Sequence, residues 1–318
     1  MNSSYQAPNR KYWKGRNSNI SEYWYQCIAL IDLIKETNLS ADIAFIGYQC
    51  EEGVDRNQGR LGAKDGPNAI RRFLGGLPVH HKDLVLADCG DLVYNEEVEL
   101  HTFQLQFAGH IARLLRNRIF PIALGGGHDI SYAHFCGIHE AFHHQGKRFG
   151  IINFDAHFDL RQDERSTSGT PFLQILSQFG DHTKYLVLGI QKSSNPKSLF
   201  DTAHATGTRF ISHERCRLPL MSENLQEIDQ FHDDLDHLYV TIDMDGFSSA
   251  YSRGVSAPSP FGLSPDYVIT VLKHLMKTGK VVALDFAETN PTFDIDQATS
   301  RLASKLIFEV VQSIEVES

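Results

Sequence analysis

The sequence predicts an α/β protein built around a parallel sheet, and three observations support this fold class. Short apolar runs recur along the chain, and most are continuous, as expected for strands that are covered on both faces. Segments with the three- and four-residue spacing of amphipathic helices separate these runs. Three of the runs end in acidic stretches, where ligand sites lie in open parallel sheets. Strands that alternate with helices favour a parallel α/β sandwich.

The expected strands are eight runs rich in Val, Ile and Phe. In chain order they are residues 42–48, 83–87, 120–124, 149–154, 185–189, 208–212, 238–242 and 281–286.

The clearest expected helix spans residues 99–116. Its apolar side chains at helical spacing are Phe103, Leu105, Phe107, Ile111, Leu114 and Leu115. A second helix is expected to begin at Pro265, a favoured first helical residue, with Ser264 as its N-cap. Apolar spacing over residues 302–310 indicates a C-terminal helix.

The chain of 318 residues is long enough to bury a sizeable core as one large domain or as two smaller ones. It contains no repeat, no low-complexity run and no linker. We therefore expect a single domain over residues 1–318, with residues 1–40 as an N-terminal extension that packs on it.

Composition and charge indicate the class of partner. The formal net charge is −9 and no basic block stands out, which argues against nucleic acid as a partner. No segment is long and apolar enough to suggest a membrane span. The five cysteines are scattered and include no CxxC pair, as expected of reduced thiols in the cytoplasm. We expect a cytoplasmic enzyme with a small-molecule substrate.

Six candidate metal ligands follow three of the expected strands. They are His128; Asp155, His157 and Asp159; and Asp243 and Asp245. Residues two apart on an extended chain point the same way, so each Asp-x-Asp or Asp-x-His pair can converge on one point. So many carboxylates at the mouth of a buried sheet must be neutralised by cations or protons. Four carboxylates and two imidazoles exceed the needs of one ion and predict a two-metal site.

The chemistry of these ligands favours Mn²⁺. Two divalent cations would balance four aspartates with both histidines neutral. Carboxylate and imidazole ligands without a thiolate suit Mn²⁺, and Zn²⁺, Fe²⁺ and Co²⁺ stay open. A water shared by two such ions loses a proton near neutral pH and becomes a nucleophile.

The chain resembles the ureohydrolases, the arginase–agmatinase family, in residues 125–129, 153–159, 241–245 and 285–291. The resemblance implies a three-layer α/β/α sandwich with an eight-stranded parallel sheet and two Mn²⁺ ions per subunit. It also implies a homo-oligomer, since family members are commonly oligomeric. By motif position, one ion would be held by His128, Asp155, Asp159 and Asp243, and the other by Asp155, His157, Asp243 and Asp245. Asp155 and Asp243 would bridge the two ions.

Within this family, residues 12–16, 52–63 and 166–172 are most similar to formimidoylglutamases, which act in histidine degradation. The implied reaction is hydrolysis of the amidine N-formimidoyl-L-glutamate to L-glutamate and formamide. In arginases, the position of Phe172 is a histidine that shuttles protons. This departure argues against arginase activity.

The resemblance also implies catalytic roles. A metal-bridging hydroxide would attack the formimidoyl carbon, and Asp159 would pass its proton to the departing nitrogen. Glu288 would face the cationic amidine and bind it by charge-assisted hydrogen bonds.

The two carboxylates of the glutamate portion need cationic partners. Arg161, two residues beyond Asp159, is the first candidate, because a guanidinium binds a carboxylate in a bidentate manner. Arg60 is the second candidate. Ser168 and Thr170, in the stretch shared with formimidoylglutamases, are further candidates for substrate binding.

Three alternatives differ in class. The first is another ureohydrolase, such as an agmatinase, a guanidinobutyrase or an arginase. The second is a single-zinc deacetylase of related fold, which would not need His128, Asp159 and Asp245 as ligands. The third is a non-catalytic protein that has kept the fold.

Overall fold

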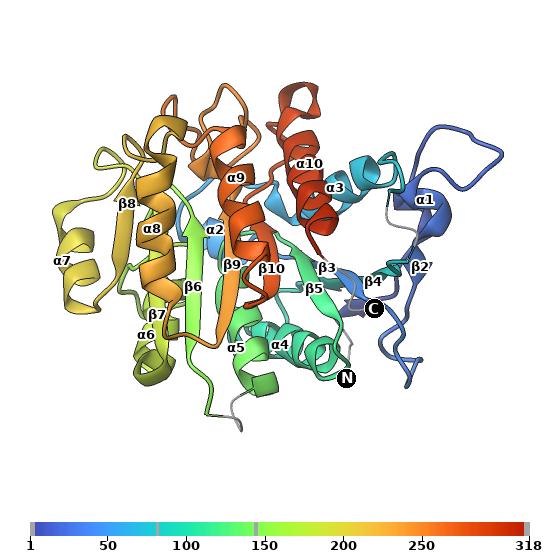
Figure 1. Cartoon of the computed structure of the whole chain (residues 1–318). Helices are drawn as coiled ribbons and strands as arrows, with labels where there is room; N and C mark the ends of the chain where they lie inside the picture. Colours follow the sequence, from blue (N-terminus) through green and yellow to red (C-terminus); the bar gives the residue numbers. More distant parts are fainter. Residues whose placement is uncertain (1–3, 81–82, 143–145, 315–318) are drawn as a thin grey trace.

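The computed structural model describes residues 4–80, 83–142 and 146–314, and its centre is one mixed sheet (Figure 1). Within these residues the sheet has ten strands in the order β1-β4-β3-β5-β10-β9-β6-β7-β8, and β2 also pairs with β4. The strands are β1 Tyr5–Gln6, β2 Ala29–Leu30, β3 Ile43–Gln49, β4 Leu86–Val93, β5 Phe120–Leu124, β6 Phe149–Phe154, β7 Thr183–Ile190, β8 Arg209–Ser212, β9 His237–Asp243 and β10 Val281–Ala287.

All eight predicted strands are present, as β3 to β10, and they pair in parallel. The two-residue strands β1 and β2 extend this parallel core, β1 in the antiparallel direction. The fourth strand runs to Val93, well beyond the predicted residue 87, and includes Asp88 and Asp91. These acidic residues can lie inside a buried strand because Arg71 pairs with both of them.

The α-helices alternate with the strands as predicted. They are α1 Trp24–Cys27, α2 Glu52–Arg56, α3 Gly66–Leu74, α4 Leu100–Arg116, α5 Ile130–Phe142, α6 Pro171–Phe179, α7 Lys197–Ala205, α8 Met221–His232, α9 Pro265–Met276 and α10 Ala298–Gln312. Short 3₁₀ helices are η1 Arg10–Tyr12, η2 Ala63–Asp65, η4 Gly180–His182, η5 Leu218–Leu220, η6 Met244–Gly246 and η7 Ile295–Gln297.

Two helix starts have side-chain caps, and the cap at Ser264 is the predicted one. Glu99 precedes α4, and its side chain accepts hydrogen bonds from the backbone N–H groups of His101 and Thr102. Ser264 precedes α9, and its hydroxyl accepts from the N–H group of Tyr267. These bonds satisfy donors that the first helical turn leaves unpaired.

Helices cover both faces of the sheet, which gives the predicted three layers (Figure 1). On one face, α3, α8, α9 and α10 pack over side chains such as Phe45, Val240 and Phe286. On the other face, α4, α5, α6 and α7 pack over the opposite side of the same strands, including Tyr239 and Ala283. Burial on both faces explains why the strand sequences are continuously apolar.

The N-terminal segment contributes to the same core. Its strands β1 and β2 both pair with β4 at the sheet edge. The rings of Trp13 and Trp24 lie near Phe45, with centroids 5.8 and 6.1 Å away. The indole N–H of Trp13 donates to Asp88 Oδ2 at 2.7 Å, so the segment is fixed by both apolar and polar contacts.

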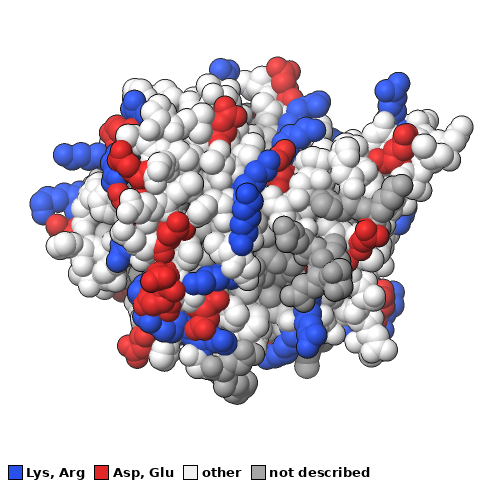
Figure 2. All heavy atoms as spheres, in the orientation of Figure 1, with Lys and Arg blue, Asp and Glu red and all other residues white. Residues whose placement is uncertain are grey.

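Acidic and basic side chains are interspersed on the face shown in Figure 2. Surface pairs such as Lys184 with Asp234, at 2.7 Å, illustrate this mixing. In the part of the chain that the structure describes, none of the helices has the length and apolar character needed to cross a bilayer.

Candidate metal centre and substrate cavity

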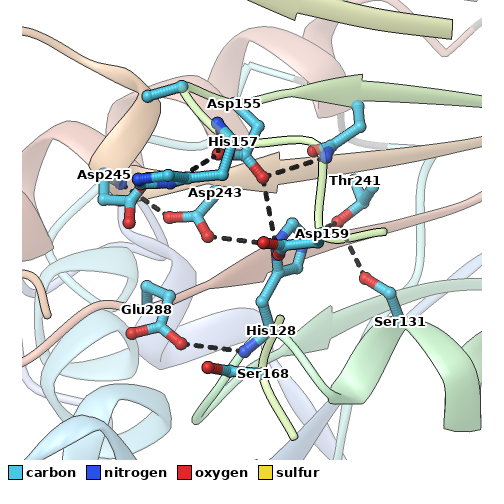
Figure 3. Close-up of polar contacts among 12 residues, drawn as sticks. His128, Ser131, Asp155, His157, Asp159, Ser168, Thr241, Asp243, Asp245 and Glu288 are labelled. Atoms are coloured by element: carbon cyan, nitrogen blue, oxygen red, sulfur yellow. Dashed lines mark hydrogen bonds and ion pairs between the residues drawn. The ribbon is translucent and has the colours of Figure 1, made fainter. Parts of the chain in front are cut away.

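The three stretches of candidate ligands meet at one edge of the sheet. Strands β5, β10, β9 and β6 are consecutive neighbours, and their carboxyl ends lie together. His128 lies four residues after β5, Asp155 follows β6 directly, and Asp243 ends β9. Figure 3 shows their side chains, with those of Asp159 and Asp245, pointing toward a common centre.

Glycine allows the turn that carries His128. The N–H groups of Gly126 and Gly127 donate to the carbonyl oxygens of Tyr48 and Cys50 at 2.8 and 3.0 Å. A Cβ at residue 126 would lie 1.8 Å from the Cys50 carbonyl oxygen, so only glycine fits this close approach.

One group of possible ligands surrounds the Nδ1 atom of His128. This nitrogen lies 2.9 Å from Asp159 Oδ2, 3.0 Å from Asp243 Oδ2 and 3.3 Å from Asp155 Oδ2. The His128 side chain is 1% exposed, so these atoms form a buried cluster. They are the four residues that the sequence predicts for one of the two ions.

A second group of possible ligands lies beside the first. His157 Nδ1 is 3.3 Å from Asp155 Oδ1 and 3.3 Å from Asp245 Oδ1. Asp155 belongs to both groups, with one oxygen directed to each, as predicted for a bridging carboxylate. Asp243 belongs only to the first group, and its Oδ1 accepts a hydrogen bond from the N–H group of Asp245 at 2.7 Å. Its role as a second bridging ligand stays a prediction.

Backbone geometry places the two predicted catalytic residues. Asp159 and Glu288 have positive φ angles of 49° and 62°, in the left-handed region that residues other than glycine seldom adopt. Such backbone strain is concentrated at functional sites. It turns both side chains toward the same cavity, where they lie on opposite sides of His128.

Glu288 follows β10 directly and contacts the loop that carries His128. Its Oε1 accepts a hydrogen bond from the His128 N–H group at 2.9 Å. Its Oε2 is buried and has no hydrogen-bond partner among the described residues. A buried carboxylate oxygen without a donor is costly, and this one is available to a bound ligand.

Burial and mutual repulsion shift the ionisation of the acidic groups. Burial raises the pKa of Asp159 to about 6, and the neighbouring Asp155 adds to the shift. Burial, with the nearby charges of Asp243 and Asp245, raises the pKa of Glu288 well above its usual range. Burial and Asp243 have the same effect on the pKa of Asp245.

The pKa values of the two histidines are also raised, although burial alone would lower them. Burial acts to lower the pKa of His128, but Asp243 and the hydrogen-bonded Asp155 raise it well above its ordinary value. Asp245 likewise outweighs burial and raises the pKa of His157. The cluster therefore attracts positive charge, and protons supply it when no other cation is near.

The donor set fits two divalent cations. Within each group, one candidate atom from each residue lies within 4.8 Å of the others. The atoms are carboxylate oxygens and imidazole nitrogens, with no cysteine among them, which suits a metal such as Mn²⁺. Asp245 Oδ1 has an ion-pair contact with His157 Nδ1 at 3.3 Å but no hydrogen bond among the described residues, so the protein does not saturate these ligands with hydrogen bonds.

A cavity of about 280 Å³ opens over the cluster. Candidate ligands and Glu288 form part of its lining. The other lining residues are Asn57, Gln58, Gly59, Arg161, Ser168, Ser194, Asn195, Leu199, Ser256 and Ala257. Arg161 is the one Lys or Arg in this lining, so within the described residues it is the cavity's cationic side chain.

Arg161 and Ser168 lie at the cavity, as the sequence predicts. The Arg161 N–H group donates to the Gly169 carbonyl at 2.9 Å. A Cβ at residue 169 would lie 3.0 Å from Arg161 Cδ, so the small glycine gives this arginine space beside the loop. Among the described residues, no carboxylate lies within ion-pair distance of the Arg161 guanidinium. The Ser168 hydroxyl accepts a hydrogen bond from Asn57 Nδ2 at 3.1 Å.

The structure places Arg60 and Thr170 outside this cavity, contrary to the expectation that both bind substrate there. The Arg60 guanidinium donates to the carbonyl oxygens of Val255 and Ser256, and it lies 4.1 Å from the centroid of the Phe293 ring. The Thr170 hydroxyl is buried within its own loop, where it donates to the Thr167 carbonyl. In this structure both residues hold loops together through these contacts.

Phe172 supports the cluster from behind. Its ring is buried, lies edge-on to the His128 ring at 5.3 Å and stacks on Tyr185 at 4.3 Å. It is absent from the cavity lining, which agrees with the prediction that no side chain at this position shuttles protons.

Sequence reasoning missed Asn57 and Asn195, which both line the cavity. Asn195 Oδ1 accepts from the N–H group of Phe158 at 3.0 Å, so it also fixes the turn between His157 and Asp159. Asn57 belongs to the stretch 52–63, whose similarity to formimidoylglutamases was the available signal. No comparable pattern marks Asn195.

Comparison with known proteins identifies the family. The sequence profile that describes the arginase family matches residues 41–312 of this chain. This chain belongs to the arginase family. The predicted resemblance is therefore confirmed.

The curated relatives compared here are formimidoylglutamases. Those of Geobacillus kaustophilus and Ralstonia nicotianae are 38% and 36% identical to this chain. The alignments cover 96% of this chain and 97% of the first relative, and 95% of this chain and of the second. A solved structure of a Trypanosoma cruzi formiminoglutamase variant with Mn²⁺ is 27% identical, with a TM-score of 0.78, and covers 88% of this chain and 95% of that one.

Proposed function

We propose that this protein hydrolyses N-formimidoyl-L-glutamate to L-glutamate and formamide at a centre of two Mn²⁺ ions. The observation that carries the proposal is the pair of overlapping ligand groups at the floor of a cavity that contains Arg161. The names of the relatives above support the substrate, and the Mn²⁺ of the Trypanosoma cruzi structure supports the metal.

Six side chains would hold the two ions: His128, Asp155, His157, Asp159, Asp243 and Asp245. When bound, two such ions supply Lewis acidity that makes water nucleophilic near neutral pH. Asp155, with one oxygen in each group, would be the shared ligand.

Glu288 would bind the amidine. The amidine is basic and carries a positive charge at neutral pH. Glu288 lines the cavity, and its Oε2 has no hydrogen-bond partner among the described residues. A charge-assisted hydrogen bond to this oxygen would hold the formimidoyl group over the cluster and keep its carbon electrophilic. The hydrogen bond from His128 to Oε1 would fix the orientation of the carboxylate.

Asp159 would move the proton. Water adds to the formimidoyl carbon, the bond from that carbon to the glutamate nitrogen breaks, and the nitrogen must gain a proton. Asp159 lines the cavity, and its Oδ2 lies 2.9 Å from His128 Nδ1, so a carboxylate that can accept and return a proton stands beside the cluster. A histidine shuttle at Phe172 is not required for this transfer.

Arg161 would bind a carboxylate of the glutamate portion. The substrate carries two carboxylates and one cationic amidine, so its net charge is −1, and the chain's own charge of −9 does not attract it. A local cation is needed, and the guanidinium of Arg161 has the planar geometry for bidentate binding.

We further propose a cytoplasmic homo-oligomer whose subunits each form one domain, with residues 1–40 as an extension. The shared sheet and the burial of Trp13 and Trp24 support the single domain. The described cysteines are all free, as expected in a reducing compartment. The usual oligomeric state of the family supports the oligomer.

A substrate panel tests the function. Metal-free protein would be loaded with Mn²⁺ and assayed in parallel on formimidoylglutamate, arginine, agmatine and guanidinobutyrate, with metal content measured by elemental analysis. We expect two Mn²⁺ per chain and the highest kcat/KM for formimidoylglutamate. A higher kcat/KM for a guanidine substrate would assign another ureohydrolase activity, and one zinc per chain with deacetylation would overturn the proposal.

A further inference from the structure

A buried chain of hydrogen bonds connects the back of the His128 ring to Asp285, on the side away from the cavity. His128 Nε2 lies 3.0 Å from the Thr241 hydroxyl oxygen. Figure 3 shows both side chains. The Thr241 hydroxyl donates to Asp285 Oδ1 at 2.6 Å. All three residues are at most 1% exposed, so water does not compete for these bonds.

The fold brings these groups together. Thr241 in β9 and Asp285 in β10 are register partners in the sheet. Helix α5 packs over this face and places Ser131 and His134, three residues apart, on the same side. The Ser131 hydroxyl lies 3.2 Å from the Thr241 hydroxyl, and His134 Nδ1 lies 2.8 Å from Asp285 Oδ2.

Asp285 is the terminal acceptor of the chain. An ionised carboxylate only accepts hydrogen bonds. Besides Thr241, the hydroxyl of Tyr239 donates to Asp285 Oδ2, the same oxygen that His134 contacts. Tyr239 is two residues before Thr241, so both side chains point to the same face of β9. Three donors from two elements thus hold one buried carboxylate.

This arrangement determines the direction of every bond in the chain. The Thr241 hydroxyl has one proton, and the proton is directed to Asp285. Its oxygen can then accept two hydrogen bonds, which Ser131 and the Nε2–H group of His128 supply. In neutral His128 the proton therefore resides on Nε2, and Nδ1 presents a lone pair to the cluster of Asp155, Asp159 and Asp243.

We infer that Thr241 and Asp285 are positioning residues that fix the Nε2–H tautomer of His128 and so raise the affinity of one metal position. The inference rests on the proposed function, because it treats the cluster as a two-metal centre. His157 differs, since its side chain is 25% exposed and its ring contacts only Asp155 and Asp245 among the described residues. The chain therefore acts on the position that contains His128 and not on the one that contains His157.

Metal titration tests the inference without substrate. Metal-free wild-type protein, Thr241→Val and Thr241→Ser would be titrated with Mn²⁺ by calorimetry, with free Mn²⁺ followed by electron paramagnetic resonance. Groups that orient metal ligands typically change metal affinity by about 10–100-fold. We expect a loss of that size at one of two positions in Thr241→Val, with the other within about threefold of wild type. Thr241→Ser keeps the hydroxyl and should bind both ions normally.

A second variant, Asp285→Asn, tests the same inference if Thr241→Val fails to fold. In Asp285→Asn, an NH₂ group at the Oδ1 position meets the Thr241 donor, and one at the Oδ2 position meets the Tyr239 donor. Either orientation weakens the buried acceptor, and the same metal position should weaken. The melting temperature of each metal-free variant separates this effect from a general loss of structure. Equal weakening of both positions with a lower melting temperature would assign a merely structural role and overturn the inference.

The outcomes separate this inference from the proposed function. Wild-type affinity at both positions in Thr241→Val and Asp285→Asn would refute the role of the chain and leave the proposed substrate standing. Two-site Mn²⁺ binding by the wild type without hydrolysis of formimidoylglutamate would refute the substrate and leave this inference intact. A wild type that binds fewer than two Mn²⁺ ions would overturn both.

Discussion

Two buried clusters of charge in this molecule have opposite organisation. In the first, Arg71 of α3 pairs with Asp88 and Asp91 of β4 at 3.0 and 2.5 Å. In the second, at the other strand ends, the candidate ligands include aspartates and histidines but no lysine or arginine. Both clusters are buried, yet only one contains its own permanent cation.

Hydrogen bonding differs in the same way. Asp88 accepts from Arg71 and the Gly90 N–H group through Oδ1 and from Trp13 through Oδ2. By contrast, Asp245 Oδ1 and Glu288 Oε2 lack hydrogen-bond partners among the described residues. A buried charge cluster saturated by the protein is structural, whereas one with unsaturated oxygens has capacity for a ligand.

The largest effect is expected from a change of Asp155, the carboxylate that both ligand groups share. Asp155→Asn should lose both Mn²⁺ ions and lower kcat/KM by about 10³-fold or more, since metal ions supply several kcal/mol of transition-state stabilisation. The metal-free variant should also be less stable than wild type, because His128 and His157 outweigh burial and hold the pKa of Asp155 below its usual range, so the folded state favours this negative charge. Elemental analysis, steady-state kinetics and thermal unfolding measure these effects.

Asp163→Asn is the matched control, because Asp163 is exposed on the following loop and only accepts from the Arg165 N–H group. It should keep its metal and activity. Retention of two ions by Asp155→Asn would contradict the assignment of Asp155 as the shared ligand.

The opposite result is expected in the structural cluster. Arg71→Met leaves two carboxylates buried without their cation, and should lower the free energy of unfolding by about 3–5 kcal/mol. Denaturant unfolding measures this loss. Lys197→Met is the control, since Lys197 is 87% exposed in its pair with Asp201 and should change stability by at most about 1 kcal/mol. Equal effects in the two variants would show that burial does not determine the value of these pairs.

Arg161→Gln tests the cationic side chain that lines the cavity over the metal cluster. Loss of one charge-assisted pair of about 1.5–3 kcal/mol should raise KM for formimidoylglutamate about 10–100-fold with a smaller change in kcat. Turnover of agmatine, which has no carboxylate, should be unaffected. Arg165→Gln, exposed on the same loop and outside the cavity lining, is the matched control. An unchanged KM in Arg161→Gln would remove this residue from the substrate site.

The sequence pattern was sufficient to predict the strands and the place of the candidate ligands, because both depend on local features. Continuous apolar runs indicate doubly covered strands, and the carboxyl ends of neighbouring parallel strands necessarily meet. The end of β4 was not predictable in this way. Its Asp88 and Asp91 are acceptable inside a strand only because Arg71, on a different element, reaches them.

Substrate contacts were harder to predict because they depend on loops distant in sequence. The sequence ranks Arg161, two residues beyond Asp159, before Arg60 in the stretch 52–63, but both stay candidates. The structure separates them, since carbonyl oxygens of Val255 and Ser256 bind the Arg60 guanidinium from almost 200 residues away. Asn195 reaches the cavity through a similar long-range contact with Phe158.

The smallest predicted effect concerns His110, a partly buried side chain. Unlike the two charge clusters, it has neither a counter-ion nor candidate metal ligands beside it among the described residues. Burial, with a contribution from the nearby Arg113, lowers the pKa of His110 from 6.5 to about 4. Its ring packs against Tyr5 at 5.3 Å and is neutral in the folded state near pH 7. The unfolded chain binds a proton at this site near pH 6.5, whereas the folded chain does so only near pH 4. Stability from this group is therefore present above pH 6.5 and is lost as the pH falls toward 4.

Between pH 7 and pH 5 this linkage should remove about 1–2 kcal/mol, allowing for the partial exposure of the ring. His110→Leu should abolish that part of the pH dependence, as measured by denaturant unfolding at several pH values on metal-free protein. Curves of unfolding free energy that stay parallel for wild type and His110→Leu would show that His110 ionises equally in both states. Burial alone would then be insufficient to keep a group neutral, and the contrast between the two charge clusters would need another explanation.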